Sequence, residues 1–456
     1  MPFPKKPQKN RFVYLDYAAA TPLDQRVLSA MRPFLGWGFA NPSGLSAASV
    51  RVRRAIDTAR ESLGSVMGTP PDMIIFTSGG TESCNLAILG TAVSSYGHII
   101  TTCIEHPAVL EPIRQLEKKG WTVTYLPVDE YGRVKVDDVQ KAIQKNTVLV
   151  SIMYANNEIG TIQPIAEIGR EILKWRKRHK TPYPYFHTDA CQAAGYLDLF
   201  VDRLHVDLLS ANGSKVYGPK GIGMLYKRRG VPIEPMISGG GQEFGLRSGT
   251  ENVAGIIGLA EALKLVTKKQ ATALGGVPSA GGKTRNLKLG NLRDYFGREI
   301  QKKIPEIKFN GHPVDRLPNH LSVTFRGVEA EALVLYLDAY GIVAASGAAC
   351  ASVLDETSHV LRACGMSEKD ARSTVRFTLG RQTKKEDIAY VMRYLPGVVK
   401  ELRGLRDYSS RSKMRRLSSQ MRRPLKKKIG TPEIVNTARK MPTPFEFRSI
   451  PTLRAV

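Results

Sequence analysis

Short runs of apolar and β-branched residues alternate with helical patterns between residues 73 and 227. Apolar runs of about four to eight residues that are rich in β-branched side chains are typical of buried strands. The stretches between them follow the helical period, as in PIAEIGREILKWRKRH, where Pro164 suits the start of a helix. The predicted strands are MIIF, HIITT, VTYLPV, TVLVSIMY, YPYFHT, VDLLSA and GMLYK.

This alternation predicts an α/β fold, in which a mostly parallel sheet is flanked by helices on both faces. In open sheets of this kind, ligands bind at the carboxyl ends of the strands. The residues directly after each predicted strand are therefore the first candidates for a functional site.

The pattern changes further along the chain. Residues 266–290 are rich in Gly, Ser, Ala and Lys, which predicts a flexible insertion or linker. Beyond them, HLSVTFRGV, AEALVLYLDAYGI, STVRFTLG and KKEDIAYVMRYL predict a smaller α+β domain. We expect an N-terminal segment (1–30) that packs on the small domain, a large domain (31–265), the insertion, the small domain (291–405) and a basic C-terminal tail (406–456).

The composition is that of a soluble globular protein, because 42% of the 456 residues are hydrophobic and 24% are charged. No apolar run approaches the roughly 20 residues that a bilayer-spanning helix needs. The first residues, MPFPKKPQKNRF, lack the apolar stretch of a secretory signal. We therefore expect a cytoplasmic protein without a membrane partner. The five cysteines show no metal-like spacing, so no metal site is predicted.

The chain is strongly basic, with 67 Lys and Arg against 41 Asp and Glu and a formal net charge of +26. Much of the excess lies in RSKMRRLSSQMRRPLKKK, residues 411–428. Such a segment can bind RNA or an acidic partner, or it can be a solvated, disordered tail. No RNA- or DNA-binding signature accompanies it, so both interpretations stay open.

Candidate functional residues follow or end three of the predicted strands. The turn after MIIF places Gly80 and Thr81 where a helix begins, and such amides bind phosphate, although any strand-to-helix turn can look similar. Asp189 ends an apolar strand, where a carboxylate needs a cation or a donor, or serves as a helix cap. Lys215 follows VDLLSA in SANGSKVYGPKGIG, a setting that suits a Schiff-base lysine. A phosphate cradle, a lysine and an acid are what pyridoxal 5'-phosphate requires from a protein.

With these residues in place, the chain resembles the cysteine desulfurases, pyridoxal-phosphate enzymes of the class V aminotransferase group. The likeness extends from Tyr14 to about Leu405. It implies a large domain of the fold type I transferases, a small domain and a homodimer. The matching stretches are YLDYAAATPL, FTSGGTESCNLAI, IEHPAVL, VSIMYANNEIGTIQPI, HTDACQAAG, SKVYGPKGIGMLY, GGGQEFGLRSGT, ASGAACAS and VRFTLGR.

The resemblance assigns four residues to the cofactor ring. Lys215 would form the internal aldimine, and Asp189 would pair with the pyridine nitrogen and keep it protonated. Gln192 would hydrogen-bond the phenolic oxygen of the ring. His106 would stack on the ring and assist proton transfer, whereas a lone histidine is otherwise a surface or core residue.

Other residues are assigned to phosphate, substrate and sulfur. Asn157 would face both cofactor and substrate, and Arg376 would bind the amino-acid carboxylate through its two-pronged guanidinium group. Cys350 would accept the sulfur, although without the other motifs it would be read as an inert residue in a turn. The remaining contacts are Gly80 and Thr81 to the phosphate of the same subunit and Thr250 to the phosphate of the neighbouring subunit.

The chain departs from the family pattern at three positions. Ser214 stands where a histidine usually precedes the lysine, Asn212 replaces a serine, and Ala47 stands where a histidine is expected. Asn212 and Ser214 can still donate to a phosphate, so both remain candidates for cofactor binding.

The resemblance implies an L-cysteine desulfurase that releases alanine and leaves a persulfide on Cys350. The spacing from Cys350 to SHVLRACG is similar to the branch with a longer catalytic loop, which serves iron–sulfur assembly and tRNA thiolation. An iron–sulfur scaffold or a tRNA-thiolation protein would then accept the sulfur. The alternatives are a selenocysteine lyase, an aminotransferase, or a degenerate basic RNA-binding or scaffold protein.

Overall fold

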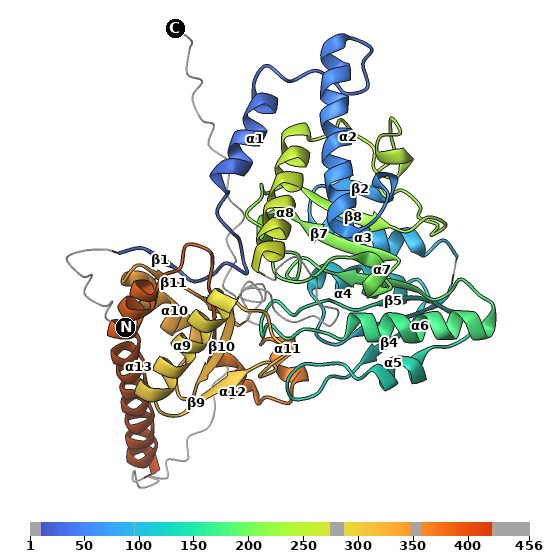
Figure 1. Cartoon of the computed structure of the whole chain (residues 1–456). Coiled ribbons are helices and arrows are strands. Elements are labelled where there is room, and N and C mark those ends of the chain that lie inside the picture. The colour runs from blue at the N-terminus through green and yellow to red at the C-terminus, as the bar shows by residue number, and fades with distance from the viewer. Residues whose placement is uncertain (1–10, 95, 274–286, 348–356, 422–456) are drawn as a thin grey trace, which may run out of the picture. The chain divides into compact units, whose positions relative to one another are not determined.

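A computed structural model describes residues 11–94, 96–273, 287–347 and 357–421. The chain divides into two compact units, residues 1–406 and 407–456. The first unit contains the sheets and most of the helices (Figure 1). Among the described helices, none has the length and apolar character that crossing a bilayer requires.

A seven-stranded sheet with the order β2–β8–β7–β6–β5–β3–β4 forms the centre of the large domain. The strand β8 runs antiparallel to both neighbours, so β2 and β7 on either side of it point the same way. The other pairs are parallel. The strands are β2 (Ile74–Thr77), β3 (His98–Thr102), β4 (Thr122–Leu126), β5 (Thr147–Ser151), β6 (Tyr185–Asp189), β7 (Leu208–Asn212) and β8 (Gly223–Lys227).

Helices cover both faces of this sheet. Successive strand residues point to opposite sides, so an apolar strand presents apolar side chains to both faces. Ile100 and Leu209 belong to the core beneath one set of helices, which includes α2, α6 and α8, whereas Ile99 and Leu208 pack against α3 and α4. The predicted α/β fold with a mostly parallel sheet is thus confirmed. The helices are α1 (Gln25–Leu35), α2 (Ala47–Met67), α3 (Gly80–Thr91), α4 (Pro107–Glu117), α5 (Val136–Ala142), α6 (Ile165–His179), α7 (Val201–Leu204) and α8 (Val253–Ala273), with 3₁₀ turns η1 (Pro71–Met73), η2 (Gly213–Lys215) and η3 (Glu243–Gly245).

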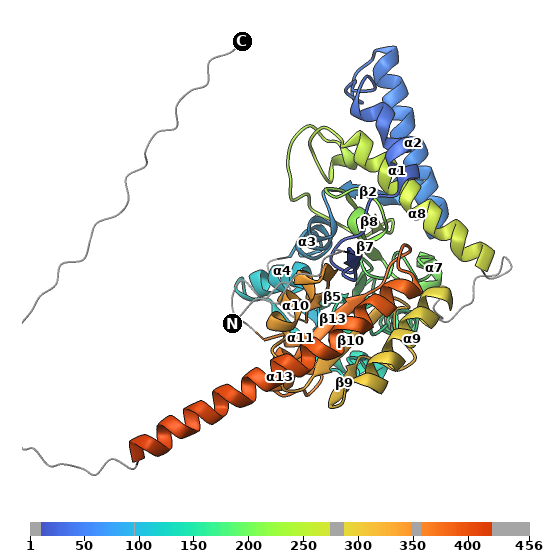
Figure 2. The same cartoon turned by 90° about the vertical axis from the view of Figure 1, so that its left-hand side faces the viewer.

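The second part of the first unit is a four-stranded antiparallel sheet, β12–β13–β10–β9, with helices beside it (Figure 2). Its core includes Phe296, Phe325 and Phe377, whose rings meet edge to face. The elements are α9 (Leu287–Lys303), β9 (Ile307–Asn310), β10 (His320–Phe325), α10 (Ala330–Ala339), β11 (Ile342–Val343), β12 (Ala345–Ser346), α11 (His359–Ala363), α12 (Glu368–Arg372), β13 (Thr374–Thr378) and α13 (Lys385–Met421).

Three helices reach into segments for which the sequence predicts no helix. The helix α8 continues to Ala273 and α9 begins at Leu287, so the predicted insertion 266–290 shares residues with both, and its centre lies outside the described residues. The helix α13 continues to Met421, into the predicted tail. Arg, Lys, Met, Leu and Gln are good helix formers, and the segment has no glycine or proline between 405 and 421 to end the helix.

The N-terminal strand β1 (Val13–Tyr14) pairs in parallel with β11, and Asp16 bridges to Thr378 of β13. After β1 the chain runs on to Thr21, whose backbone N–H donates to the carbonyl oxygen of Ser214 at 2.9 Å. The segment between therefore connects the small domain to the carboxyl end of β7.

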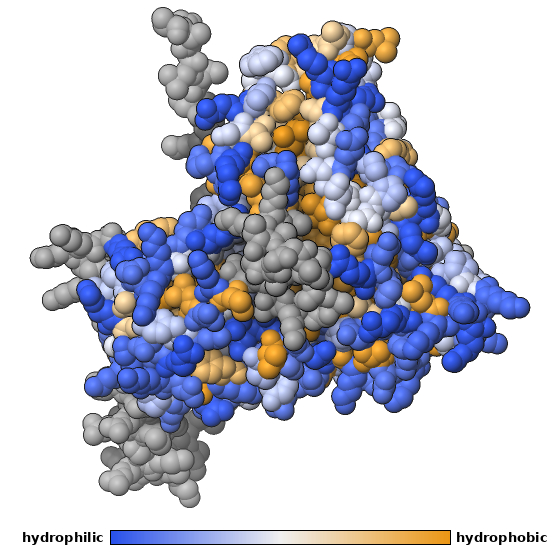
Figure 3. All heavy atoms as spheres, in the orientation of Figure 1, coloured by the Kyte–Doolittle hydropathy of each residue, from blue (hydrophilic) through white to orange (hydrophobic). Residues whose placement is uncertain are grey.

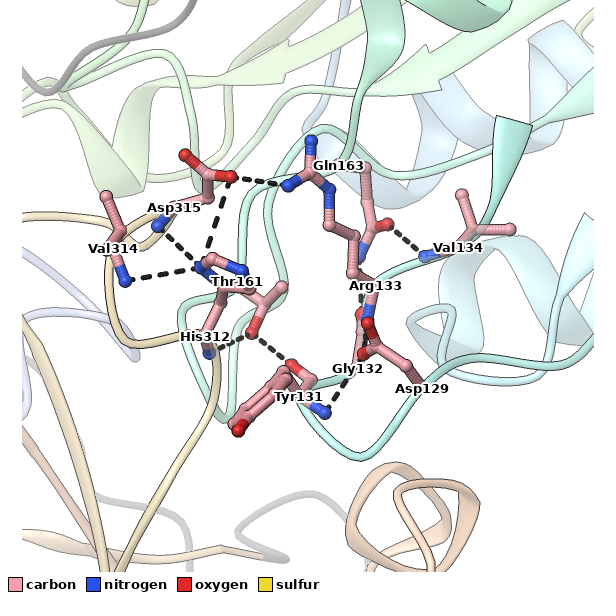
Figure 4. A network of polar contacts seen from close by, with 10 residues as sticks. All are labelled: Asp129, Tyr131, Gly132, Arg133, Val134, Thr161, Gln163, His312, Val314 and Asp315. Atoms are coloured by element: carbon pink, nitrogen blue, oxygen red, sulfur yellow. Dashed lines mark hydrogen bonds and ion pairs between the residues drawn. The ribbon is translucent and has the colours of Figure 1, made fainter. Parts of the chain in front are cut away.

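A polar network joins the connection before α5 to the connection between β9 and β10 (Figure 4). Thr161 Oγ1 donates to the carbonyl oxygen of Tyr131 at 2.6 Å and accepts from the backbone N–H of His312 at 3.0 Å. Arg133 forms an ion pair with Asp315. This network fixes the turn from residue 154 to residue 162, which carries Asn157, against the small domain.

Candidate active site

The predicted residues of the large domain gather at one edge of the seven-stranded sheet. Because β2, β3, β5, β6 and β7 point the same way, their carboxyl ends share this edge. Gly80 follows β2, His106 follows β3 and Asn157 follows β5. Asp189 is the last residue of β6, and Lys215 ends the turn after β7.

Lys215 lies in a turn that only a glycine-containing chain can make. A Cβ atom on Gly213 would come within 2.4 Å of the carbonyl oxygen of Pro219. The Lys215 ammonium group donates to the carbonyl oxygen of Ala19. Ser214 Oγ lies 3.4 Å from Asn212 Oδ1, so the two residues that replace the usual family pattern contact each other.

His106 is the N-cap of α4, where Pro107 suits the first helical position. Its Nδ1 accepts from the backbone N–H of Ala108 at 3.1 Å, which leaves the proton of the neutral ring on Nε2. Burial lowers the pKa of His106, the positive charge of Lys215 acts in the same direction, and Asp189 opposes both. Both charged groups therefore lie close enough to His106 to act on its pKa.

Asp189 is buried, and its Oδ1 accepts from the backbone N–H of Cys191 at 2.9 Å. This bond resembles the helix cap considered as an alternative, but the structure assigns turns rather than a helix to residues 191–196. Gln192 follows in the same turn and donates through Nε2 to the carbonyl oxygen of Ala18 at 3.0 Å. The ring candidates Asp189 and Gln192 are thus both fixed by the turn after β6.

The helix α3 offers an anion site at its first turn. The N-cap is Gly79, which makes no side-chain cap, so the first amides of the helix depend on another acceptor. A Cβ atom on Gly80 would lie 2.6 Å from Cys191 Sγ and 3.0 Å from Asn212 Nδ2, so this approach requires glycine. Thr81 is exposed in the same turn. The residues present therefore fit a phosphate group next to a lysine and an acid.

Thr250 lies in a different place, on an exposed stretch after η3. It lines a cavity of about 220 Å³ together with Thr77 and Ser78, which precede the turn of Gly80. Arg247 on the same stretch donates to Glu82 at 2.9 Å, and Glu82 also accepts from the Ser78 amide. The stretch that carries Thr250 is thus held to the turn before Gly80 of its own chain by Arg247 and Glu82.

Arg376 of β13 is buried beside the turn after β5. Its Nη1 donates to the carbonyl oxygen of Asn157 at 2.8 Å, and its Nη2 donates to Asp16 Oδ1 at 2.7 Å. Its Nε is buried and has no partner among the described residues. A guanidinium group with an unused donor at this depth is suited to an anionic ligand.

Two buried glutamates in the same region did not enter the predicted site. Burial raises the pKa of Glu105 to about 8, although it accepts from Thr102 and from the amide of Met153. Burial raises the pKa of Glu158 to about 7, while Ser358 and Arg376 act in the opposite direction. Their positions next to His106 and Asn157 are the only sequence signal that could have found them, because charged residues after strands are usually exposed.

Cys350 lies outside the described residues. The chain is described again from Thr357, and Ser358 Oγ donates to Glu158 at 2.5 Å. His359 Nε2 lies 2.9 Å from the carbonyl oxygen of Glu105. The segment directly after the predicted catalytic loop thus contacts the turns that follow β3 and β5.

Comparison with known proteins decides the family. The family model described as aminotransferase class-V matches residues 13–391. The chain belongs to the class-V aminotransferases. Among its relatives, the cysteine desulfurase IscS of Dictyoglomus turgidum is 46% identical over 411 residues, which cover 90% of this chain and 100% of that protein. IscS of Methanosarcina thermophila is 44% identical and covers 87% of this chain and 94% of the relative.

Solved structures agree with this assignment. A NifS-like protein superimposes with a TM-score of 0.76 at 34% identity, covering 86% of this chain and 100% of its own. A structure of SspA in complex with cysteine gives a TM-score of 0.68 at 36% identity, covering 80% and 98%. The predicted resemblance to the cysteine desulfurases is therefore confirmed.

Proposed function

We propose that the protein is a pyridoxal-phosphate-dependent L-cysteine desulfurase that transfers sulfur to Cys350 and releases alanine. The observation that supports this most directly is the gathering of Lys215, Asp189 and His106 at one sheet edge, beside the glycine turn of α3. The relatives named cysteine desulfurase make cysteine the first substrate to test.

The large-domain residues would hold the cofactor from three sides. The amides at Gly80 and Thr81, with Asn212 and Ser214, would bind the phosphate. Asp189 would face the pyridine nitrogen and Gln192 the phenolic oxygen. When bound through Lys215, the cofactor supplies an electron sink for the carbon that loses its proton.

Proton transfer would fall to His106 and Lys215. His106, whose pKa is lowered by burial, is neutral near neutral pH and has Nε2–H as a donor. Lys215 is the base proposed for the α-proton of cysteine. Arg376 would hold the carboxylate of the substrate, and Asn157 positions Arg376 through its carbonyl oxygen. The Cys350 thiolate would then take the sulfur.

The decisive experiment concerns Cys350. Cys350→Ser keeps the size of the side chain but cannot carry a persulfide, so the variant should bind cofactor and cysteine and release almost no alanine. Wild-type protein exposed to cysteine should gain one sulfur atom on the peptide that contains Cys350 by mass spectrometry.

Cys103→Ser is the matched control, because Cys103 is a half-buried free thiol after β3. It should turn over cysteine at close to the wild-type rate. Normal turnover by Cys350→Ser, or sulfur found on Cys103 instead, would contradict the proposed mechanism.

We also propose a homodimer. The connection from α1 to α2 exposes Trp37, Phe39 and Leu45, with 80%, 83% and 98% of each residue accessible. Orange side chains are visible among blue ones at the top of Figure 3, over these elements. Large exposed apolar groups close in sequence indicate a protein interface. Light scattering should give twice the chain mass, and Trp37→Ser combined with Phe39→Ser should weaken the dimer.

Two further proposals concern the sulfur acceptor and the basic tail. Relatives named IscS make an iron–sulfur scaffold or a tRNA-thiolation protein the acceptors to test. The basic residues 411–428 are proposed to bind RNA or an acidic partner, and binding through phosphates should weaken steeply with added salt. Salt-independent binding would exclude the RNA. The cytoplasm is the proposed location.

A further inference from the structure

One short segment contacts the residues proposed for both the substrate carboxylate and the cofactor. Asp16 pairs with Arg376 through its side chain. Two and three residues later, the carbonyl oxygen of Ala18 accepts from Gln192, and that of Ala19 accepts from the Lys215 ammonium group. We call residues 16–21 the connecting segment.

In this arrangement Asp16 lies on a nitrogen that every two-pronged contact of Arg376 requires. Nη1 and Nη2 each donate one N–H, to Asn157 and to Asp16, and the buried Nε has no partner among the described residues. A two-pronged contact uses Nη2 together with either Nη1 or Nε, so both pairs include the nitrogen that Asp16 holds. The side chains of Arg376 and Asp16 are only 6% and 15% exposed. A substrate carboxylate must therefore displace a present partner before it can form the two-pronged contact.

Electrostatics determines which partner gives way. The carbonyl oxygen of Asn157 is neutral and belongs to a turn fixed by buried hydrogen bonds of Asn156. Asp16 carries the same charge as a substrate carboxylate, so a third group beside the existing pair would place two anions on one buried cation. Exchange of one carboxylate for another keeps the local charge unchanged.

We propose that Asp16 occupies the place of the substrate carboxylate on Arg376, and that substrate binding displaces it. The displacement frees one end of the connecting segment, whose other contacts hold Gln192 and Lys215. Asp16 thus competes with the amino acid for Arg376 and weakens its binding. Because Ala19 of the same segment contacts Lys215, binding of a carboxylate to Arg376 would also affect the position of Lys215. This inference rests on the proposed function, since it assumes that Arg376 binds an amino-acid carboxylate.

The test is Asp16→Asn, which keeps the shape and an oxygen acceptor for Arg376 but removes the competing charge. The inhibition constant of L-alanine, the proposed product, should fall roughly tenfold, and the KM for L-cysteine should fall with it. Inhibition by ethylamine, which is alanine without its carboxylate, should change little. Equilibrium binding of L-alanine by calorimetry should show the same tightening.

Two variants sharpen the result. Asp24→Asn is the matched control, because Asp24 is also 15% exposed and paired with arginines, Arg26 and Arg381, outside the proposed site. It should leave alanine affinity unchanged. Asp16→Glu retains the charge and should bind alanine no more tightly than the wild type.

Unchanged or weaker alanine binding by Asp16→Asn, in a protein that still turns over cysteine, would overturn the exchange and make Asp16 a residue that merely orients Arg376. Equal tightening of ethylamine would also overturn it, because the effect would then not involve the carboxylate. A wild-type protein that neither turns over cysteine nor binds alanine would instead refute the proposed function itself.

Discussion

The two ends of the central sheet treat buried charge in opposite ways. At the amino ends of β6 and β7, Asp207 accepts from the amide of Phe186 at 2.7 Å and pairs with Arg176 and Arg228. At the carboxyl ends, Glu105 Oε2 has no partner among the described residues, and neither has Nε of Arg376, which reaches this end from β13. Asp207 thus pairs with two arginines, although Nε of Arg228 is too poorly aligned with it to hydrogen-bond, whereas Glu105 keeps an oxygen without a partner in the described part of the chain.

This difference separates stability from function. A buried acid that is surrounded by donors holds its neighbours in one arrangement, and removing it leaves uncompensated charges behind. Unused donors and acceptors lower stability, but they are the groups that a ligand can satisfy. Substitutions at the two ends should therefore affect different measurements.

The largest effect is expected at Lys215. Lys215→Ala should reduce turnover of cysteine by about 10⁴-fold or more, because the variant loses both the proposed attachment point of the cofactor and the proposed base. The free energy of unfolding should change by less than about 1 kcal/mol, since the side chain is only half-buried. Assays of alanine release and urea unfolding check the two halves, and substantial turnover would refute the assignment.

At the amino ends of β6 and β7, Asp207→Ala should lower stability much more than turnover. We expect the free energy of unfolding to fall by about 3–5 kcal/mol, because Arg176 would be left buried without its partner. Asp72→Ala removes an exposed pair with Arg229 and should cost about 1 kcal/mol or less. Equal losses in the two variants would show that the amino-end network does not stabilise the sheet.

An intermediate effect is expected at Glu158, as a dependence on pH. Burial raises its pKa to about 7 from 4.5, so between these values the folded protein holds a proton that the unfolded chain has lost. The free energy of unfolding should therefore fall as pH rises through this range, by up to about 3 kcal/mol, and the loss should be complete above pH 7.

Glu158→Gln should remove this contribution and be more stable than the wild type at pH 8, as measured by urea unfolding between pH 5 and 8. The free energy of unfolding of this variant should still fall somewhat with rising pH, because the pKa of Glu105 is also raised. Glu167→Gln, at an exposed position, is the control. Parallel curves for wild type and Glu158→Gln would contradict the raised pKa.

The smallest effect is expected at Ser214. Ser214→His restores the residue usual in the family and should strengthen cofactor binding by about 1 kcal/mol, through one regained hydrogen bond. A titration of the apoprotein followed by visible absorbance measures this. Weaker binding would show that the pair of Asn212 and Ser214 already serves the phosphate as well as a histidine does.

The sequence predicts local elements well, because each strand of the large sheet is a compact apolar run. GMLYK coincides with β8, and MIIF differs from β2 by one residue at each end. The antiparallel position of β8 between β2 and β7 does not follow from the pattern, since strand order depends on long-range pairing. The site residues at strand ends could be named in advance for the same local reason.

Contacts between distant parts of the chain could not be predicted in this way. Asp16 and Arg376 are 360 positions apart, and neither lies in a pattern that points to the other. Glu158 stands in a polar turn of a kind that is usually solvated, but here it is buried and accepts from Ser358, which lies 200 positions away in the sequence. The helix α13 extends further than predicted because weak apolar periodicity does not prevent helix formation.

The pairing of β1 with β11, and of Asp16 with Arg376, has a consequence for how the protein is made. A ribosome that adds roughly 5–20 residues per second needs roughly 20 to 70 seconds to pass from Asp16 to Arg376. The first strand gains its partner β11 shortly before that point, while the large sheet between them can already assemble. The nascent chain therefore completes the proposed binding site for the amino-acid carboxylate only after most of its mass has been synthesised, and a truncated product would hold the lysine without the arginine.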